Sequence, residues 1–449
     1  MLQDHNFLYT ASGKFFWYST LVAVALILLL IANAAGAGNG QVAKEGAAAT
    51  SALRLLKTVP IPGTGANTTN GKLYSFDISF VDQSTQTYYL ADRSNVAVDV
   101  VDAATATLIG PISVSPPFAG VVPAPICMAS GGSNCSGPNG VVAAYPWLFV
   151  TDGGSRVVNI DLRTGQIAPG GDIVTAAGDP NRADELAYDP DIGLLLVINN
   201  ADTPPFGTLI KVDKTNGQLQ VARRIPLPFA TAGAEQPVWN PDTQKFYLSI
   251  PEINGNLTNR HGAVVRIDPL SATVDAMYPV DFCGPAGLTL GPDQQLLIGC
   301  NTVFDTAGNV WSPTGNVTAA PKDVILDLKT GSATDVPGVG AGDEVWYNSS
   351  DGNYYATGSG SPLRPTLSAT AQGASALGVI DAVDRSLLQL VPTFNVPAVG
   401  TGNNSTEHPA GTAHSVAANA ANNYILVPLA ANNVFPGCLT GCITVFFRP

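Results

Sequence analysis

Polar side chains with metal-binding or acid–base chemistry recur at one position of a repeated sequence unit. This position directly follows the start of the first strand that we expect in each unit. Carboxylate and amide oxygens gathered there would suit Ca²⁺, and an imidazole among them would suit a transition metal. The residues at this position, in chain order, are Ile78, Asn139, Glu185, Gln236, Gly287, Glu344 and His414.

Two interpretations of this set are open. In a metal-assisted hydrolase, Glu185 and Glu344 would bind the ion, and His414 would be a further ligand or the general base. His408 would join His414 around a transition metal. The other interpretation is a water-filled channel whose polar residues are solvated and bind nothing specific. A register shifted by one residue also predicts an acidic mouth, because it presents Asp77, Asp184, Glu235 and Asp343.

The elements that would position these residues are short strands that recur along the chain. One strand of each unit ends in Asp, and several copies are followed by a turn such as Thr164-Gly165 or Asn216-Gly217. Because an Asp side chain bonds nearby backbone amides, we expect this residue to form the turn and not to catalyse a reaction. The six copies end at Asp102, Asp161, Asp213, Asp268, Asp327 and Asp381.

Each unit has room for four strands. An aromatic or aliphatic strand such as Tyr88 to Asp92 precedes the Asp strand, and a further strand lies on either side of this pair. Seven units of about 56 residues predict an all-β fold, a seven-bladed β-propeller of four-stranded antiparallel blades. The last unit, His414 to Phe447, stops after its third strand. We therefore expect the segment Leu55 to Pro62 to supply its fourth strand and close the ring.

This repeat resembles the YVTN family of extracytoplasmic seven-bladed β-propellers, in which an aromatic strand, an Asn or Asp turn and a Val-x-Val-Ile-Asp strand follow one another. Tyr88 to Thr107 and Trp147 to Gly165 carry the resemblance best. The resemblance covers residues 75 to 447, and the last three units differ from the family pattern by insertions. The resemblance implies the propeller fold but leaves activity open, since this family and the related lactonase-like propellers include binding proteins, scaffolds and a few enzymes.

An apolar run from Phe15 to Ala32 has the features of an export signal, with Lys14 before it and small residues after it. We expect residues 1–37 to be a signal peptide or, because the run approaches the length of a membrane span, a retained anchor. Residues 38–53 would be a linker and residues 54–449 the propeller. The protein is then periplasmic, secreted or tethered at the cell surface, and it meets the membrane only through its N-terminal segment.

The cysteines also fit an oxidising compartment, because they lie close together in pairs. Their spacing matches neither a haem attachment site nor a zinc ribbon. We therefore expect three local disulfides. The expected pairs are Cys127 with Cys135, Cys283 with Cys300, and Cys438 with Cys442.

Charge and loop lengths bear on the partner. The 449-residue chain has a formal net charge of −13, which disfavours binding to nucleic acid. Its long loops, among them 111–137 and 358–375, all belong to the rim at which the first strands begin. Because loops on a rigid scaffold are frequent binding sites, we expect a module that holds a protein, a polymer or a small molecule at this rim. The alternative is a metal-dependent hydrolase of lactonase type with its site at the channel mouth.

Overall fold

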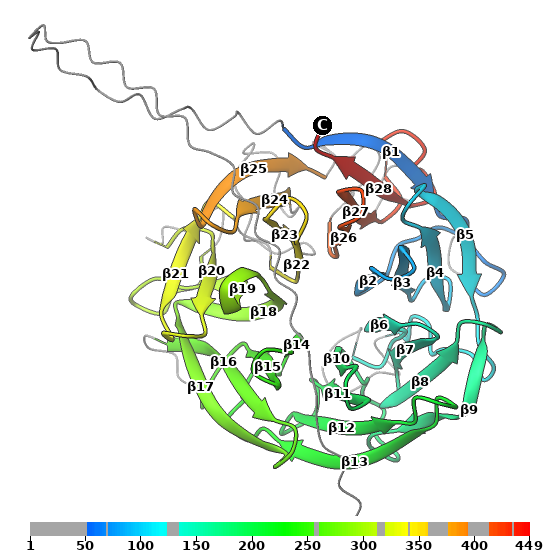
Figure 1. Ribbon diagram of the computed structural model, residues 1–449, viewed down its shortest axis with the longest axis horizontal. Coiled ribbons are helices and arrows are strands. Elements are labelled where there is room, and N and C mark those ends of the chain that lie inside the picture. Colours follow the sequence, from blue (N-terminus) through cyan, green and yellow to red (C-terminus); the bar gives the residue numbers. More distant parts are fainter. Residues whose placement is uncertain are drawn as a thin grey trace, which may run out of the picture. The chain divides into compact units, whose positions relative to one another are not determined.

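Seven four-stranded antiparallel sheets stand around a common axis, as Figure 1 shows. The computed structural model describes residues 52–68, 71–123, 134–255, 260–311, 319–339, 342–357, 376–393, 413–432 and 435–449. Among these residues the only helix is a short 3-10 turn, Pro292–Gln294. The expected all-β, seven-bladed propeller is therefore confirmed.

Strand position within a blade follows chain order in the first six blades, from the axis outward (Figure 1). The inner strands are β2 (Ser79–Asp82), β6 (Val141–Ala144), β10 (Leu186–Asp189), β14 (Pro237–Asn240), β18 (Cys283–Leu290), β22 (Glu344–Asn348) and β26 (Ala417–Asn419). The second strands are β3 (Thr87–Asp92), β7 (Trp147–Asp152), β11 (Leu194–Asn199), β15 (Lys245–Ile250), β19 (Gln295–Val303), β23 (Asn353–Thr357) and β27 (Tyr424–Leu429). The third strands are β4 (Ala97–Asp102), β8 (Arg156–Asp161), β12 (Phe206–Val212), β16 (Arg260–Asp268), β20 (Lys322–Asp327), β24 (Ala376–Asp381) and β28 (Cys442–Phe447). The outer strands are β5 (Thr107–Ile112), β9 (Gln166–Val174), β13 (Leu219–Pro226), β17 (Thr273–Asp281), β21 (Ala333–Pro337), β25 (Ser386–Pro392) and β1 (Arg54–Pro60).

The seventh blade is built from both ends of the propeller sequence. β1 pairs antiparallel with β28, from Arg54 opposite Phe447 to Pro60 opposite Cys442. The N-terminal strand thus takes the outer place that the last unit leaves open, which is where the sequence pattern puts it. This pairing covers the ladder edge of β28 and joins the ends of the ring.

The Asp at the end of each third strand forms the turn that follows it. Asp213 Oδ1 accepts the backbone N–H of Thr215 at 2.9 Å. Asp327 Oδ1 accepts those of Lys329 and Thr330 at 2.9 and 3.1 Å. The prediction of a turn former is confirmed in every copy, since the same bond to the residue two positions on is made by Asp102, Asp161, Asp268 and Asp381.

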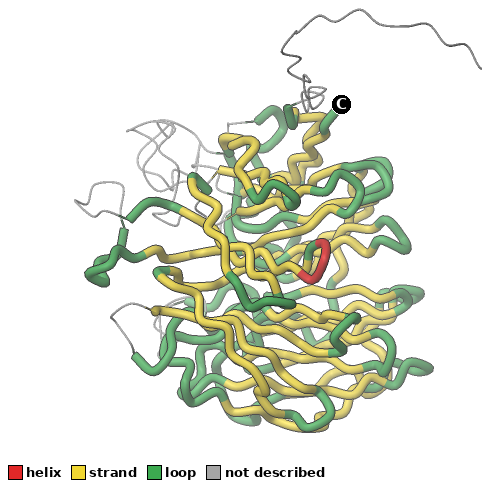
Figure 2. The backbone as a smooth tube through the Cα atoms, turned by 60° about the vertical axis from the view of Figure 1, so that its left-hand side comes forward, coloured by secondary structure: helices red, strands yellow, loops and turns green. Residues whose placement is uncertain are grey.

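Apolar side chains fill the space between neighbouring blades. The second strands contribute fully buried aromatic rings, among them Tyr88, Phe149 and Phe246. Tyr89 of the first blade and Leu148 of the second belong to one cluster, and similar clusters follow around the ring. Figure 2 shows the strands stacked over one another with the loops gathered at their ends. The scaffold that carries those loops is therefore rigid.

Two of the three expected disulfides are present. Cys283 pairs with Cys300, and Cys438 pairs with Cys442. Cys127, half of the third expected pair, lies outside the described residues. The segment expected to be a signal or anchor also lies outside them, and no helix in the described part of the chain is long and apolar enough to cross a membrane.

Candidate functional site at the channel

Neighbouring inner strands approach most closely where they begin. The N–H of Ile78 donates to Asn139 O, and the N–H of Gly140 donates to Asp184 O, each at 3.2 Å. A Cβ atom on Gly140 would lie 2.7 Å from the same Asp184 oxygen, so this approach of two backbones requires glycine. Adjacent blades are thus joined directly at the rim on which the inner strands start.

Charged side chains from four blades meet at this rim. Asp77 pairs with Arg93 through one carboxylate oxygen, and its other oxygen lies 2.7 Å from His414 Nε2. The second ring nitrogen of His414 lies 2.9 Å from Asp343 Oδ2. We call the rim network the set of Asp77, Arg93, Arg182, Asp184, Asp343 and His414, in which Arg182 pairs with Asp184 at 2.8 Å.

The rim network holds Asp77 and His414 in their charged forms. Burial raises the pKa of Asp77, but Arg93, His414 and Arg182 outweigh it and hold that pKa well below its usual range. Burial lowers the pKa of His414, but Asp343 and Asp77 raise it to about 10. His414 therefore carries a positive charge at neutral pH and is clamped between two carboxylates.

The expected ring of polar residues is split between two levels, so the proposed alignment was wrong at Asn139 and at His414, whose ring lies between Asp77 and Asp343. The backbone N–H groups of Asp77, Asn139 and Asp184 bond equivalent oxygens of the second strands, which places these three residues at one level. Glu185 is one residue further on. The Asn139 side chain accepts from Arg93 Nε at 2.9 Å and donates to Ala183 O at 2.9 Å, so it supports the rim network.

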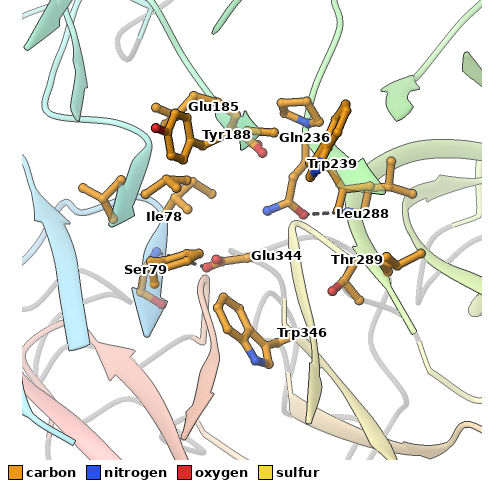
Figure 3. Close-up of a pocket in the computed structure, with 18 of the residues that line it drawn as sticks. Ile78, Ser79, Glu185, Tyr188, Gln236, Trp239, Leu288, Thr289, Glu344 and Trp346 are labelled. Atoms are coloured by element: carbon orange, nitrogen blue, oxygen red, sulfur yellow. Dashed lines mark hydrogen bonds between the residues drawn. The ribbon is translucent and has the colours of Figure 1, made fainter. Parts of the chain in front are cut away.

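Below the rim network, the channel contains a cavity of about 430 Å³, which we call the channel pocket. Glu185, Gln236 and Glu344 line the end nearer the strand starts, and Figure 3 shows them extending from three blades toward a common space. Apolar and aromatic side chains such as Tyr188 and Trp346 form much of the remaining wall. The pocket thus combines a few polar groups with a mainly apolar lining, as ligand sites do.

Glu344 joins neighbouring blades through hydrogen bonds. The side chain is 1% exposed, and its Oε2 accepts the N–H groups of Ser79 and Val416 at 3.3 and 3.1 Å. It also accepts the Ser415 hydroxyl. These donors come from the first and seventh blades, whereas Glu344 belongs to the sixth. The expectation that channel carboxylates are merely solvated is therefore wrong for this residue.

Glu185 has the opposite character. It is buried, and its Oε2 has no hydrogen-bond partner in the described part of the chain. Burial raises the pKa of Glu185 well above its usual range, and the charges of Asp184 and Glu235 raise it further. Gln236 differs again, since its Oε1 accepts the N–H of Leu288 at 2.6 Å. Among the three polar residues that line the pocket, Glu185 is therefore the best candidate to bind a ligand, because it has an acceptor atom without a donor.

Sequence reasoning missed the two arginines of the rim network. Arg93 follows the end of β3 and Arg182 lies just before β10, so both sit in loops of the same rim. Their position beside the strand ends was the available signal. Because of them the mouth is a mixed network of charges and not the predominantly acidic mouth that was expected.

Apart from Glu185, the main residues of the metal hypothesis already have other partners or lie outside the described residues. His414 is clamped by carboxylates, Glu344 by hydrogen bonds, and His408 lies outside the described residues. Within the described ranges, no group of three or more His, Cys, Asp or Glu side chains is placed to hold a metal ion. The metal site remains a prediction for experiment.

Comparison with known proteins supports the fold of this chain and shows no specific function. No protein-family model and no curated protein matches the sequence. A chain of the hydrazine synthase of Kuenenia stuttgartiensis has a similar structure, with a TM-score of 0.56 and 15% sequence identity. The similarity covers 87% of this chain and 99% of that chain. At this identity the likeness shows a shared fold alone, and the resemblance to YVTN propellers remains a prediction.

Proposed function

We propose that this chain is an extracytoplasmic binding module. The channel pocket would hold a compact organic ligand, and the long-loop rim would serve as a surface for a protein or polymer partner. The observation that carries the proposal is the buried, unpartnered carboxyl oxygen of Glu185 in a largely apolar cavity of about 430 Å³. A volume of this order suits a small ligand, and a buried acceptor without a donor favours a ligand that supplies one.

The wall of the pocket suggests the chemical class. Phe80, Tyr188, Trp239 and Trp346 line it together with the carboxyls of Glu185 and Glu344. Aromatic faces attract organic cations, and a cation beside Glu185 would favour the ionised form of its carboxyl group. An organic ammonium ligand would donate to Glu185 and place its apolar part against the rings.

The two disulfides support a location outside the cytoplasm, because such bonds persist in oxidising compartments. The alternative of a lactonase-type hydrolase would use His414 as metal ligand or general base. A His held in its protonated form between Asp77 and Asp343 neither accepts a proton nor coordinates a metal. The contacts of His414 therefore favour binding over hydrolysis.

Calorimetric titration with phenylethylammonium tests this proposal, with neutral 2-phenylethanol as the matched compound. We expect the ammonium to bind more tightly than the alcohol, and Glu185→Gln to weaken ammonium binding by about tenfold. Asp191→Asn is the control variant, because Asp191 is an exposed carboxylate in a turn. Absence of ammonium binding, or equal affinity in the two variants, would contradict a ligand site at Glu185.

A further inference from the structure

Two loops of the rim bring carboxylate and amide oxygens together away from the channel pocket. One loop joins β9 to β10 and contains Asp179 and Asn181, and the other joins β11 to β12 and contains Asn200 and Asp202. The side-chain nitrogen of Asn181 lies 3.5 Å from Asp202 Oδ1, so the two loops are in contact. The backbone N–H of Asn181 donates to Asp179 Oδ1 at 2.9 Å, which holds the first carboxylate at the same place.

Several acceptor atoms of these two loops lack a donor. Asn181 and Asn200 are only 8% and 9% exposed, yet the Oδ1 atom of each finds no hydrogen-bond partner among the residues described. Asp202 Oδ2 is buried and unpartnered in the same sense. A buried acceptor without a donor is destabilising, so three of them in adjoining loops indicate a ligand that supplies positive charge.

The surroundings leave space for that ligand. Asn200 and Asp202 line a cavity of about 640 Å³ that Glu235 and Thr231 also border. The cavity is large enough for an ion with water molecules of its own. The loop that contains Asn200 and Asp202 therefore borders a solvent-accessible space, and the loop that contains Asn181 contacts it at Asp202.

The charge balance points the same way. The carboxyl groups of Asp179 and Asp202 are close enough to interact directly, so their negative charges repel each other. In the described ranges neither carboxylate is paired with a cationic side chain. Arg182, the nearest cation along the chain, is engaged with Asp184 and Asp77.

We propose that Asp179, Asn181, Asn200 and Asp202 form a Ca²⁺ site that ties the two loops together. All four donors are oxygen atoms, which Ca²⁺ prefers and Zn²⁺ does not. Two carboxylates balance the charge of one divalent ion, and water from the cavity completes its coordination. The site shares no residue with the channel pocket and stands independently of the proposed function.

The test is a calorimetric titration of the full chain with CaCl₂ after dialysis against chelator, together with thermal melts. We expect one Ca²⁺ per chain, binding at about millimolar concentration or tighter, and a rise in Tm on binding. Asp202→Asn should weaken the affinity by about tenfold or more. The same variant should melt no lower than the wild type in chelator, since it removes a repulsion. Asn200→Ala should also weaken binding.

Two controls separate this site from other carboxylates. Asp191→Asn and Glu185→Gln should both keep the wild-type affinity for Ca²⁺. A wild type that binds no Ca²⁺ would overturn the proposal and leave a carboxyl pair that shares a proton. Equal affinity in Asp202→Asn and Asp191→Asn would overturn it too, as would loss of binding in Glu185→Gln alone.

Discussion

Aspartates occupy the two ends of the blades in different ways. At one end, the Asp that closes each third strand bonds backbone N–H groups two or three residues further on, as Asp213 and Asp327 do. At the other end, Asp77 pairs with Arg93 and with His414 of the seventh blade. The first arrangement occurs in six blades, whereas the rim network occurs once.

The difference lies in where the partners are in the sequence. A turn Asp carries its donors with it, so every copy of the repeat forms the same bonds, and the pKa of Asp213 is lowered by hydrogen bonds from Thr215. The rim aspartates also depend on groups from other blades, since Asp77 meets His414 only when the ring closes. Burial there raises the pKa of Asp184 to about 6, despite its pairing with Arg182. The same residue type is thus a local element in one place and a tertiary element in the other.

The largest effect should come from breaking the rim network at its centre. Asp77→Ala leaves Arg93 buried without its partner and removes one of the two carboxylates around His414. Removal of one member of a buried ion pair costs about 3–5 kcal/mol, so the urea midpoint of unfolding should fall markedly. An unchanged midpoint would mean that the network contributes little and that the contrast with the turn aspartates is false.

The pH dependence of Tm should show the same contrast in the unmodified chain. Burial raises the pKa of Glu344 from 4.5 to about 8, and Asp343 and Asp77 raise that of His414 from 6.5 to about 10 against the effect of burial. Between those values the folded chain holds protons that the unfolded chain releases, so stability is lost as pH rises. Asp77 has the opposite effect on the pH dependence of stability. Its pKa is lowered in the folded chain, so the stability that it contributes is lost as the pH falls below the ordinary value of 3.8.

Calorimetry should therefore find the highest Tm near about pH 5 and a clear fall by about pH 9. Turn aspartates such as Asp213 do not change the Tm between pH 5 and 9, since their lowered pKa values alter stability only in acid. A Tm that rises steadily from pH 5 to 9 would contradict the raised pKa values of the buried groups.

The two channel glutamates should respond in opposite directions. Glu344→Ala removes three hydrogen bonds between blades and should lower Tm by several degrees, whereas Glu185→Gln removes an unpartnered carboxyl and should leave Tm unchanged or higher. Equal losses in both variants would mean that their different contacts have no energetic consequence.

The same pair of variants tests the metal hypothesis for the channel mouth. A divalent ion held by Glu185, Glu344 and His414 would raise Tm in the wild type and lose that effect in Glu185→Gln. The contacts of Glu344 and His414 predict instead that any Ca²⁺ response survives this replacement. Loss of the Ca²⁺ response in Glu185→Gln would instead support a metal site at the channel mouth.

The smallest effect should come from a turn. Asp213→Ala removes a bond to an exposed backbone amide that water replaces, so Tm should fall by about 2 °C or less. A fall as large as that of Asp77→Ala would show that turn and network aspartates are energetically alike.

Much of the fold was predictable because its signals are local. Alternating apolar strands, the Asp turns and the missing fourth strand of the last unit were enough to predict seven four-stranded blades and the place of β1. The pairing of Cys283 with Cys300 followed from short spacing as well. The positions of Asn139 and His414 were misjudged, because strand starts carry no marker as sharp as a turn.

The amino-acid sequence by itself determined the blade, its count and the role of the turn aspartates, since each depends on residues a few positions apart. Tertiary structure alone decided which side chains meet at the rim. Arg182 and His414 reach Asp77, and Glu344 reaches Ser415, only after the blades have assembled around the axis. Burial then determines the state of each carboxyl group, because desolvation acts in the assembled channel and not in an isolated segment. Glu344 joins blades by hydrogen bonds, Asp77 is a charged ion-pair partner, and Glu185 keeps an acceptor without a donor.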